Sequence, residues 1–341
     1  MAATDQKGEE LQVVEAEPTP ASKRRLLTDV AFIVLKFGFA AVCLWYVTRS
    51  IDFSDLGKLA GTVNFPLAGF SVLMIMVQIP LIGIRWCKIV DALASDGTRV
   101  PRTPFLAITA IGLFFGQVAP NLVGDSVRVW MVARLGKPWR QGLISVLIDR
   151  GVGVGALLAI AFLVLLFPTG LAALGDSRII VVSIFGAILA IALAVLFLAP
   201  VIAPVLSGWR ATRLLGAFAL ASSDVLLRRS AGRKIITIAV VVHVFSIIAV
   251  WSLGHAQGFD LSVIDSAVLF AVMVGVSLVP ITIGGWGLRE LAMTSLLQLN
   301  GVSSERALLF SVSFGLVVFA ASSVGAVVWA FYSPERTGSA A

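Results

Sequence analysis

The chain has 341 residues, of which 58% are hydrophobic and only 13% are charged, and its formal net charge is +7. This composition lies far from the soluble average, so it excludes a soluble globular protein and predicts a polytopic membrane protein. Only two Cys and two His residues are present, which argues against a disulfide framework and against a structural zinc site.

The N-terminal residues 1–28 are expected to form a disordered cytoplasmic tail, because they are rich in charged and polar residues without apolar periodicity. They contain no apolar stretch typical of a cleavable signal peptide. The first apolar span follows the basic stretch SKRR, so we expect a retained helix whose N-terminus lies in the cytoplasm. Residues 29–334 are assigned to a transmembrane domain and 335–341 to a short C-terminal tail.

The apolar segments predict the membrane topology, since a helix needs about 20 apolar residues to cross a bilayer. Six segments satisfy this requirement: 30–47, 66–84, 143–167, 179–206, 235–255 and 307–332. Two others, 105–123 and 263–283, run into breaks that contain Pro and Gly. If each of these two enters the membrane, turns at its break and returns to the same side, six crossings remain. The predicted fold is therefore all-α and polytopic, with about six transmembrane helices and two re-entrant helix pairs.

The distribution of Lys and Arg supports this topology, because cytoplasmic loops collect these residues. Nineteen of the 26 lie in the proposed inner segments, a set that includes Arg85 and Arg128, and four lie in the proposed outer loops. Making both interrupted segments full crossings would place the basic loop 207–234 outside, which the same rule disfavours. We therefore expect both termini in the cytoplasm and the protein in the plasma membrane, the inner membrane of a bacterium.

The two interrupted segments resemble each other. APNLVGDSVR and VPITIGGWGLR each contain Pro, a Gly four residues later, and Arg eight or nine residues after the Pro. Each is followed by an apolar half-helix, a glycine (Gly136 or Gly301) and a span that contains Ser-Val. One segment is entered from the cytoplasm and the other from outside. This pattern predicts an inverted repeat over 66–167 and 235–332, with a transporter site at the breaks.

The breaks are expected to line a cavity, because bilayer hydrocarbon cannot satisfy unpaired backbone groups. The half-helix after each break would direct its N-terminal amides into that cavity, with Arg128 and Arg289 within a turn or two. Guanidinium groups and free amides together suit the phosphate of an anionic lipid headgroup. Two simpler interpretations stay open: each Pro only kinks a helix, or Arg128 only anchors the cytoplasmic surface.

Charged residues within spans extend the predicted site, since such residues are functional candidates by default. Asp149 and Arg150 point about 100° apart on a helix, so their partners are expected on other helices. A structural ion pair with Asp125 is an equal alternative. Glu290 is expected to pair with Arg150 across the pseudo-twofold axis, or alternatively to titrate during transport. The predicted substrate-binding residues are Pro120, Asn121, Gly124, Asp125, Arg128, Asp149, Arg150, Pro280, Gly284, Gly285, Arg289 and Glu290.

The stretch 213–229, RLLGAFALASSDVLLRR, has basic ends around an apolar centre. It predicts an interfacial helix that favours anionic lipids of the inner leaflet, although an ordinary loop helix explains it equally well. The sequence contains no P-loop, no HExxH, no GxSxG and no aspartate-rich metal loop. We therefore expect no enzymatic activity, no catalytic residues, no metal and no cofactor.

Two long blocks carry a family resemblance. FFGQVAPNLVGDSVRVWMVARLGKPWRQGLISVLIDRGVGV and SLVPITIGGWGLRELAMTSLLQLNGV resemble the lysylphosphatidylglycerol synthase transmembrane region family, also described as flippase-like integral membrane proteins. The likeness covers roughly 30–332. In two-part members this region is associated with moving aminoacylated phosphatidylglycerol to the outer leaflet, and a separate soluble domain performs the aminoacyl transfer. The chain ends nine residues after Tyr332, so we expect a short form without that domain.

The resemblance implies a domain that translocates lipids but leaves the substrate open, since short relatives are associated with hopanoids, cardiolipin and glycolipid carriers. The family usually has Glu-Arg where this chain has Asp149-Arg150, a shorter acid with the same charge. The expected partners are membrane lipids, either an anionic phospholipid or a lipid-linked substrate, and no nucleic acid. The rival hypothesis is a scaffold that does not transport and assists a separate lipid- or glycan-modifying enzyme. A membrane enzyme that uses Glu290 or Asp149 is a weaker third alternative.

Overall fold

The computed structural model describes residue 45 and residues 61–94, 101–119, 121–167, 178–209, 212–277 and 286–332. The predicted tails, nearly all of the first crossing, and the break residues Pro120, Pro280, Gly284 and Gly285 lie outside the described residues.

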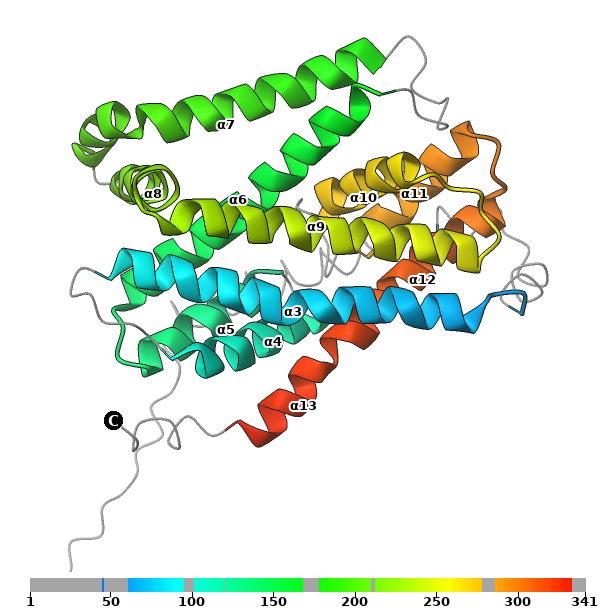
Figure 1. Cartoon of the computed structure of the whole chain (residues 1–341), viewed down its shortest axis with the longest axis horizontal. Helices are drawn as coiled ribbons and strands as arrows, with labels where there is room; N and C mark the ends of the chain where they lie inside the picture. Colours follow the sequence, from blue (N-terminus) through cyan, green and yellow to red (C-terminus); the bar gives the residue numbers. More distant parts are fainter. Residues whose placement is uncertain are drawn as a thin grey trace, which may run out of the picture.

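The described part of the chain is helical and contains no strands (Figure 1). The first six helices of the described ranges are α3 (Phe65–Leu93), α4 (Arg102–Val118), α5 (Asn121–Arg134), α6 (Trp139–Leu165), α7 (Arg178–Ser207) and α8 (Arg213–Ser223). They are followed by the π-helix η2 (Asp224–Arg228) and by α9 (Ala231–Ala256), α10 (Val263–Ser277), α11 (Leu288–Leu299), α12 (Ser304–Ser322) and α13 (Val324–Phe331). The predicted all-α fold is confirmed.

Five described segments are long and apolar enough to cross a membrane: Phe65–Leu93, Trp139–Leu165, Val182–Ser207, Ala231–Ala256 and Ser304–Phe331. They correspond to five of the six predicted crossings, and they establish a polytopic membrane protein. Helices suit this environment because they satisfy their backbone polar groups internally. The last crossing differs from the prediction in detail, since a turn at Ser323 divides it into α12 and α13.

Helix lengths follow the same order in the two predicted repeats. The helices α3 to α6 have 29, 17, 14 and 27 residues. The helices α9 to α11 have 26, 15 and 12 residues, and the last crossing has 28. Gly136 and Gly301, which the sequence placed at equivalent points, have φ angles of 81° and 78°. This left-handed backbone is accessible to Gly without steric cost, so both sequences make the same turn before a long helix.

The first helices of the two repeats pack against each other in opposite directions. The amide of Asn64 donates to the carbonyl of Ala256 over 2.8 Å, so α3 begins where α9 ends. Ser71 donates to the carbonyl of Ala249 over 2.8 Å, and Ser252 donates to that of Leu67 over 2.7 Å. Small hydroxyl residues let two membrane helices approach closely. An antiparallel pair is what an inverted repeat requires, whereas the membrane re-entry of the short helices stays a prediction.

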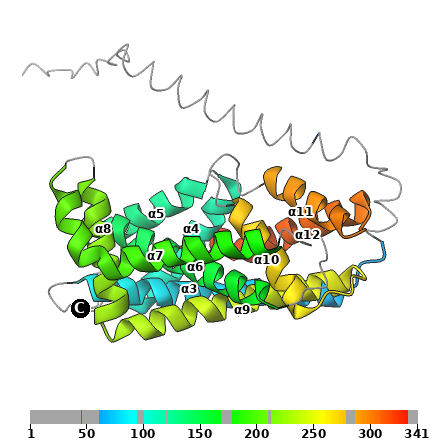
Figure 2. The same ribbon diagram turned by 90° about the horizontal axis from the view of Figure 1, so that it is seen from above.

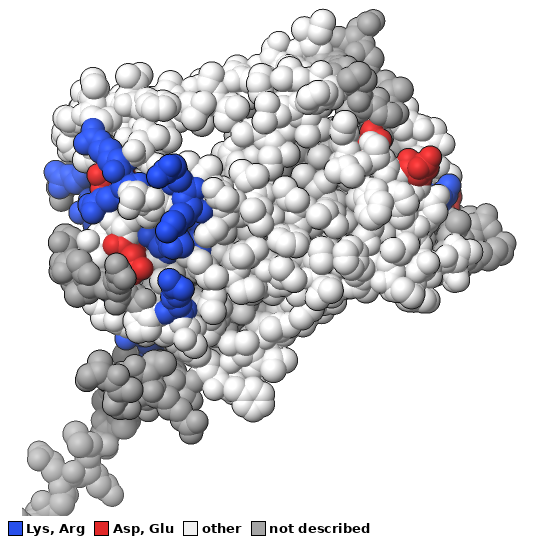
Figure 3. All heavy atoms as spheres, viewed as in Figure 1, with Lys and Arg blue, Asp and Glu red and all other residues white. Residues whose placement is uncertain are grey.

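Positive charge is concentrated at one end of the molecule. The C-terminal ends of α3 and α7, the helix α8 and the N-terminal end of α9 lie together (Figure 1), and Lys and Arg gather there (Figure 3). The helix α8 is seen end-on in Figure 1 and side-on in Figure 2, so it lies across the ends of the long helices. Its exposed Leu214, Leu215 and Leu220 suit the interfacial position predicted for 213–229.

The short helices α4 and α5 are in close backbone contact. A Cβ atom on Gly124 would lie within 3.0 Å of backbone atoms of both Gly112 and Gly116. A side chain here would therefore push α5 away from α4. The glycine that was predicted to face a ligand lies instead in the contact between the two helices.

The topology can be tested by introducing a cysteine at each end in a background without Cys43 and Cys87. Both chosen positions are exposed: Ser207 at the basic end and Asp260 between α9 and α10. We expect Ser207→Cys to react with a membrane-impermeant maleimide only from the cytoplasm and Asp260→Cys only from outside. Reaction of both from one side would contradict the predicted topology, and the cysteine-free chain provides the background signal.

The α4–α5 contact predicts different effects for two neighbouring glycines. Gly124→Ala should lower the free energy of unfolding by about 1–3 kcal/mol, because the added methyl group meets backbone that has no room to move. Gly116→Ala is the matched control, since nothing lies within 4 Å of a Cβ atom there. The control should change stability by about 1 kcal/mol or less, in the stabilising direction. Thermal unfolding in detergent measures both, and equal effects would argue against the close contact.

Candidate functional site

The first charged cluster is centred on Asp149, whose side chain is only 2% exposed. Arg85 of α3 donates from Nε to Oδ1 over 2.7 Å, and Arg128 of α5 donates from Nη2 to Oδ2 over 2.9 Å. The guanidinium of Arg128 also lies 4.1 Å from the ring centroid of Trp86. One carboxylate thus joins three helices, and each buried charge has an oppositely charged partner.

Arg150 and Asp125 form a second, more exposed pair beside this cluster. Their closest ion-pair distance, from Arg150 Nη2 to Asp125 Oδ1, is 2.9 Å, and the Arg150 side chain is 49% exposed. Asp125 also lies 3.6 Å from Arg128, so the two pairs are connected. The prediction that Asp149 and Arg150 find partners on other helices is confirmed, including the alternative pairing with Asp125.

Three sequence-based interpretations of the charges need correction. Arg85 lies within α3 and is buried, so it is not a loop residue of the positive-inside count. Arg128 is 3% exposed, which excludes the interpretation as a surface anchor. Glu290 pairs with Arg289 rather than with Arg150. In each case the burial of a charge favours the nearest opposite charge, and the sequence alone does not show which one that is.

The second charged cluster lies at the start of α11. Arg289 donates from Nε to Glu290 Oε1 over 2.9 Å, and its guanidinium lies 4.6 Å from the ring centroid of Trp286. Both charged residues are buried, with exposed fractions of 4% and 0%. Arg128 of α5 and Arg289 of α11 therefore have the same kind of surroundings, because each stacks on a Trp ring and pairs with a buried carboxylate.

Glu290 also caps the helix on which it lies. Its Oε2 accepts a hydrogen bond of 2.6 Å from the amide of Gly287, which precedes α11. A carboxylate in this position satisfies an unpaired amide and opposes the positive end of the helix dipole. The predicted use of free α11 amides for an anionic ligand is therefore limited, because an internal anion already lies there. Arg289 keeps N–H groups that have no hydrogen-bond acceptor among the described residues.

The carboxylate that pairs with the buried arginine comes from different sequence positions in the two predicted repeats. Asp149 lies four residues after Ser145, and the equivalent position four residues after Ser311 is Gly315. A Cβ atom on Gly315 would lie within 3.0 Å of both Arg289 and the Trp286 ring. The second predicted repeat thus has a glycine where the first has its acid, and Glu290 of α11 provides the negative charge.

A cavity of about 240 Å³ lies between the two predicted repeats. Its walls come from α3 and α4 on one side and from α9, α10, α11 and α12 on the other. Its polar lining residues are Gln78, Gln117, Ser246, Ser277, Arg289 and Ser322, and the rest of the lining is apolar. Gln78 accepts a hydrogen bond of 2.9 Å from Ser246, which links the first helices of the two repeats at the cavity wall.

The structure divides the predicted site residues into groups. Asp125, Arg128, Asp149 and Arg150 come together in one charged cluster, and Arg289 and Glu290 form another. Of these, Arg289 reaches the cavity. Asn121 begins α5, and Gly124 of α5 lies against α4. Sequence reasoning missed Gln78 and Gln117, although polar residues within apolar segments give a detectable signal.

The sequence of the chain was compared with models of known protein families. The family model described as "Lysylphosphatidylglycerol synthase TM region" matches residues 33–325. The chain belongs to this family. The match covers both charged clusters and the cavity, and it confirms the family that the sequence resembles. A comparison with curated proteins finds no match. Within the described residues, no group of three or more His, Cys, Asp or Glu side chains is placed to hold a metal ion.

The ion-pair arrangement of this family member predicts unequal costs for removing its two aspartates. Asp149→Asn would leave Arg85 and Arg128 as buried charges without a full counter-charge, so it should destabilise the fold by about 3–5 kcal/mol. Asp125→Asn is the matched control, because it pairs mainly with a half-exposed arginine, and it should cost about 1 kcal/mol or less. Unfolding in detergent measures the difference. A similar small cost for both would mean that Asp149 does not hold the three helices together.

Proposed function

We propose that the protein moves an amphipathic molecule with an anionic headgroup, either a phospholipid or a lipid-linked substrate, between the two leaflets of the membrane. The observation that carries this proposal is the cavity between the repeats, which is largely apolar and contains the buried cation Arg289. Binding sites between inverted repeats are typical of transporters that work by alternating access. Membership of the family supports the same function.

The size of the cavity indicates which part of such a molecule it receives. Its volume of about 240 Å³ is below the 300–1,000 Å³ typical of pockets that enclose a drug-sized ligand. The cavity therefore suits a headgroup, and acyl chains remain in the surrounding lipid. Gln78 and Gln117 offer amide groups to headgroup oxygens, while Arg289 offers a positive charge.

The ion pair of Arg289 with Glu290 affects how strongly an anion is held. In the empty cavity the carboxylate neutralises the arginine, which lowers the cost of burying that charge. A headgroup phosphate must share the guanidinium with this carboxylate, so binding is weaker than to a bare cation. Transport requires binding that is strong enough to admit the substrate and weak enough to release it.

This function implies a cellular arrangement that also belongs to the proposal. The protein lies in the bacterial inner membrane with both termini in the cytoplasm, its partners are membrane lipids, and it acts without catalysing a reaction. The basic end with α8 then faces the cytoplasm, as the positive-inside rule requires. A scaffold for a separate lipid- or glycan-modifying enzyme is the competing function, and such a scaffold has no need of a charged cavity.

The test is the transfer of fluorescent phosphatidylglycerol in proteoliposomes. Replacing Arg289 and Glu290 together by Gln removes the cation without leaving a buried carboxylate unpaired. Loss of a charge-assisted hydrogen bond, worth about 1.5–3 kcal/mol, should slow transfer by roughly tenfold or more. Arg134→Gln is the control, because Arg134 is exposed at the end of α5. Wild-type rates in the double variant would contradict the proposed role of Arg289, and inactivity of the wild-type protein would favour the scaffold.

A second variant keeps the charges of Arg289 and Glu290 and is designed to change only the position of the Arg289 side chain. Gly315→Ala should displace the guanidinium of Arg289, because the new methyl group meets it and the rigid Trp286 ring. We expect slower transfer with the protein still inserted in the membrane. Gly275→Ala on α10 is the control, since a Cβ atom there meets nothing within 4 Å. Unchanged transfer in Gly315→Ala would mean that the position of Arg289 is unimportant.

A further inference from the structure

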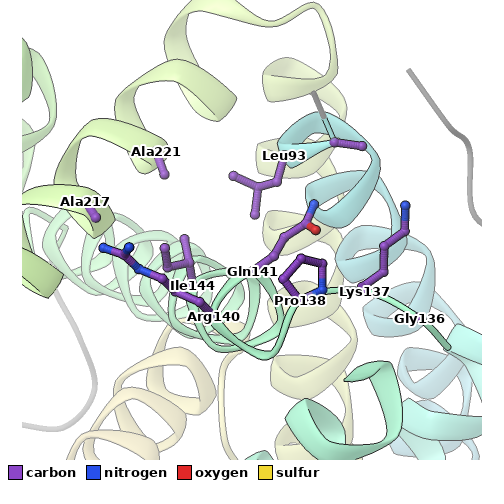
Figure 4. A pocket seen from close by; sticks show the side chains of 10 residues that line it. Leu93, Gly136, Lys137, Pro138, Arg140, Gln141, Ile144, Ala217 and Ala221 are labelled. Atoms are coloured by element: carbon purple, nitrogen blue, oxygen red, sulfur yellow. The ribbon is translucent and has the colours of Figure 1, made fainter. Parts of the chain in front are cut away.

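A second hollow lies at the basic end of the molecule, between α3, α6 and α8. Its volume is about 620 Å³, and its lining includes Lys137, Arg140 and Gln141 (Figure 4). Apolar side chains complete the wall, with Leu93 at the end of α3 and Ala221 on α8. None of the described residues that line this hollow carries a carboxylate. The described part of its wall is therefore basic and apolar.

The two cations lie on different sides of this hollow. Arg140 extends toward Ala217 of α8, and Lys137 lies on the other side of Pro138 (Figure 4). Arg140 has no ion pair among the described residues and is exposed, so its charge is accessible. The hollow also adjoins the first turn of α6, which has no side-chain cap. That helix end adds positive potential to the same space.

The hollow continues into a groove under α8. The groove has a volume of about 390 Å³, and it shares Arg140 and Ala217 with the hollow. It is lined by a third cation, Arg213, and by apolar residues that include Pro204 of α7 and Leu220 of α8. Three cations and apolar side chains therefore line the hollow and the groove together. This combination suits a molecule that has a phosphate at one end and hydrocarbon at the other.

The surroundings favour a membrane lipid over a soluble phosphate. Trp139, at the start of α6, is 66% exposed, and Leu215 on the outer side of α8 is 58% exposed. Exposed Trp side chains collect at the boundary between headgroups and hydrocarbon. The helix α8 lies across the ends of the long helices (Figure 2), which is the position expected for an interfacial helix. The hollow thus opens where phospholipid headgroups are concentrated.

We infer that the hollow between α3, α6 and α8, with the adjoining groove, binds one anionic phospholipid, whose phosphate lies between Lys137 and Arg140. This site is separate from the cavity between the repeats and shares no lining residue with it. It therefore does not rest on the proposed transport function. A lipid bound here would tie α8 to α3 and α6 and would anchor the basic end in the membrane surface.

Binding of dioleoyl phosphatidylglycerol to the full chain, followed by native mass spectrometry, tests this inference. The measurement is made in the wild type and in the background with Gln at positions 289 and 290, which disables the other cavity. Replacing Lys137 and Arg140 together by Gln should raise the Kd about tenfold or more, as expected for two charges beside an anionic headgroup. The control pair is Arg233→Gln with Lys234→Gln, which removes two exposed charges at the start of α9 outside the hollow.

Three results would overturn the inference. An equal loss in the control pair would indicate a diffuse basic surface instead of a site. Equally tight binding of dioleoyl phosphatidylcholine would show that the two cations do not select an anionic headgroup. Displacement of the lipid by an equal concentration of inorganic phosphate would assign the hollow to a soluble anion. Loss of transfer activity without loss of this lipid would affect the proposed function alone.

Discussion

The ion pairs of Asp149 hold the first half of the molecule in one arrangement. A charge inside a membrane protein needs a partner, because its removal from water costs several kcal/mol. Here one carboxylate serves two arginines from two other helices, so α3, α5 and α6 must keep their relative positions for all three charges to stay paired. Because α4 is in close contact with α5, the position of α4 also depends on these ion pairs.

The cavity depends on these ion pairs and on the antiparallel pair of α3 and α9. The hydrogen bond between Gln78 and Ser246 fixes the wall where these two helices meet. The other wall carries Arg289, whose charge is balanced by Glu290 of the same helix. One amide contact and one ion pair are thus part of a cavity wall that is otherwise lined by Gln117, two serines and apolar side chains. Such a cavity can exist in lipid without unpaired charges on its wall.

Much of the fold could be predicted from hydropathy and glycine placement. The described crossings and the paired short helices appear as apolar segments of different lengths, and Gly136 and Gly301 mark equivalent turns because few other residues adopt that backbone. The partners of the charges were harder to predict. Arg85 follows an apolar segment and resembles a cytoplasmic anchor in sequence. The helix α3 nevertheless continues past it, and its side chain is buried. Hydropathy gives the position of a residue along a helix, but packing decides the direction in which its side chain points.

Asp149 and Glu290 constrain the movement of the short helices differently, because Asp149 lies on a different helix from its arginine partners and Glu290 lies on the same helix as Arg289. Arg128 is bound to an acid on α6, so a displacement of α5 relative to α6 stretches their ion pair. Arg289 and Glu290 are consecutive residues of α11, and their pair travels with that helix as a neutral unit. A displacement of α11 therefore leaves this ion pair intact, although it strains the hydrogen bond of 3.4 Å that Ser311 of α12 donates to Glu290. The first half of the molecule thus has an ion pair that links two helices, whereas the ion pair of α11 lies within a single helix.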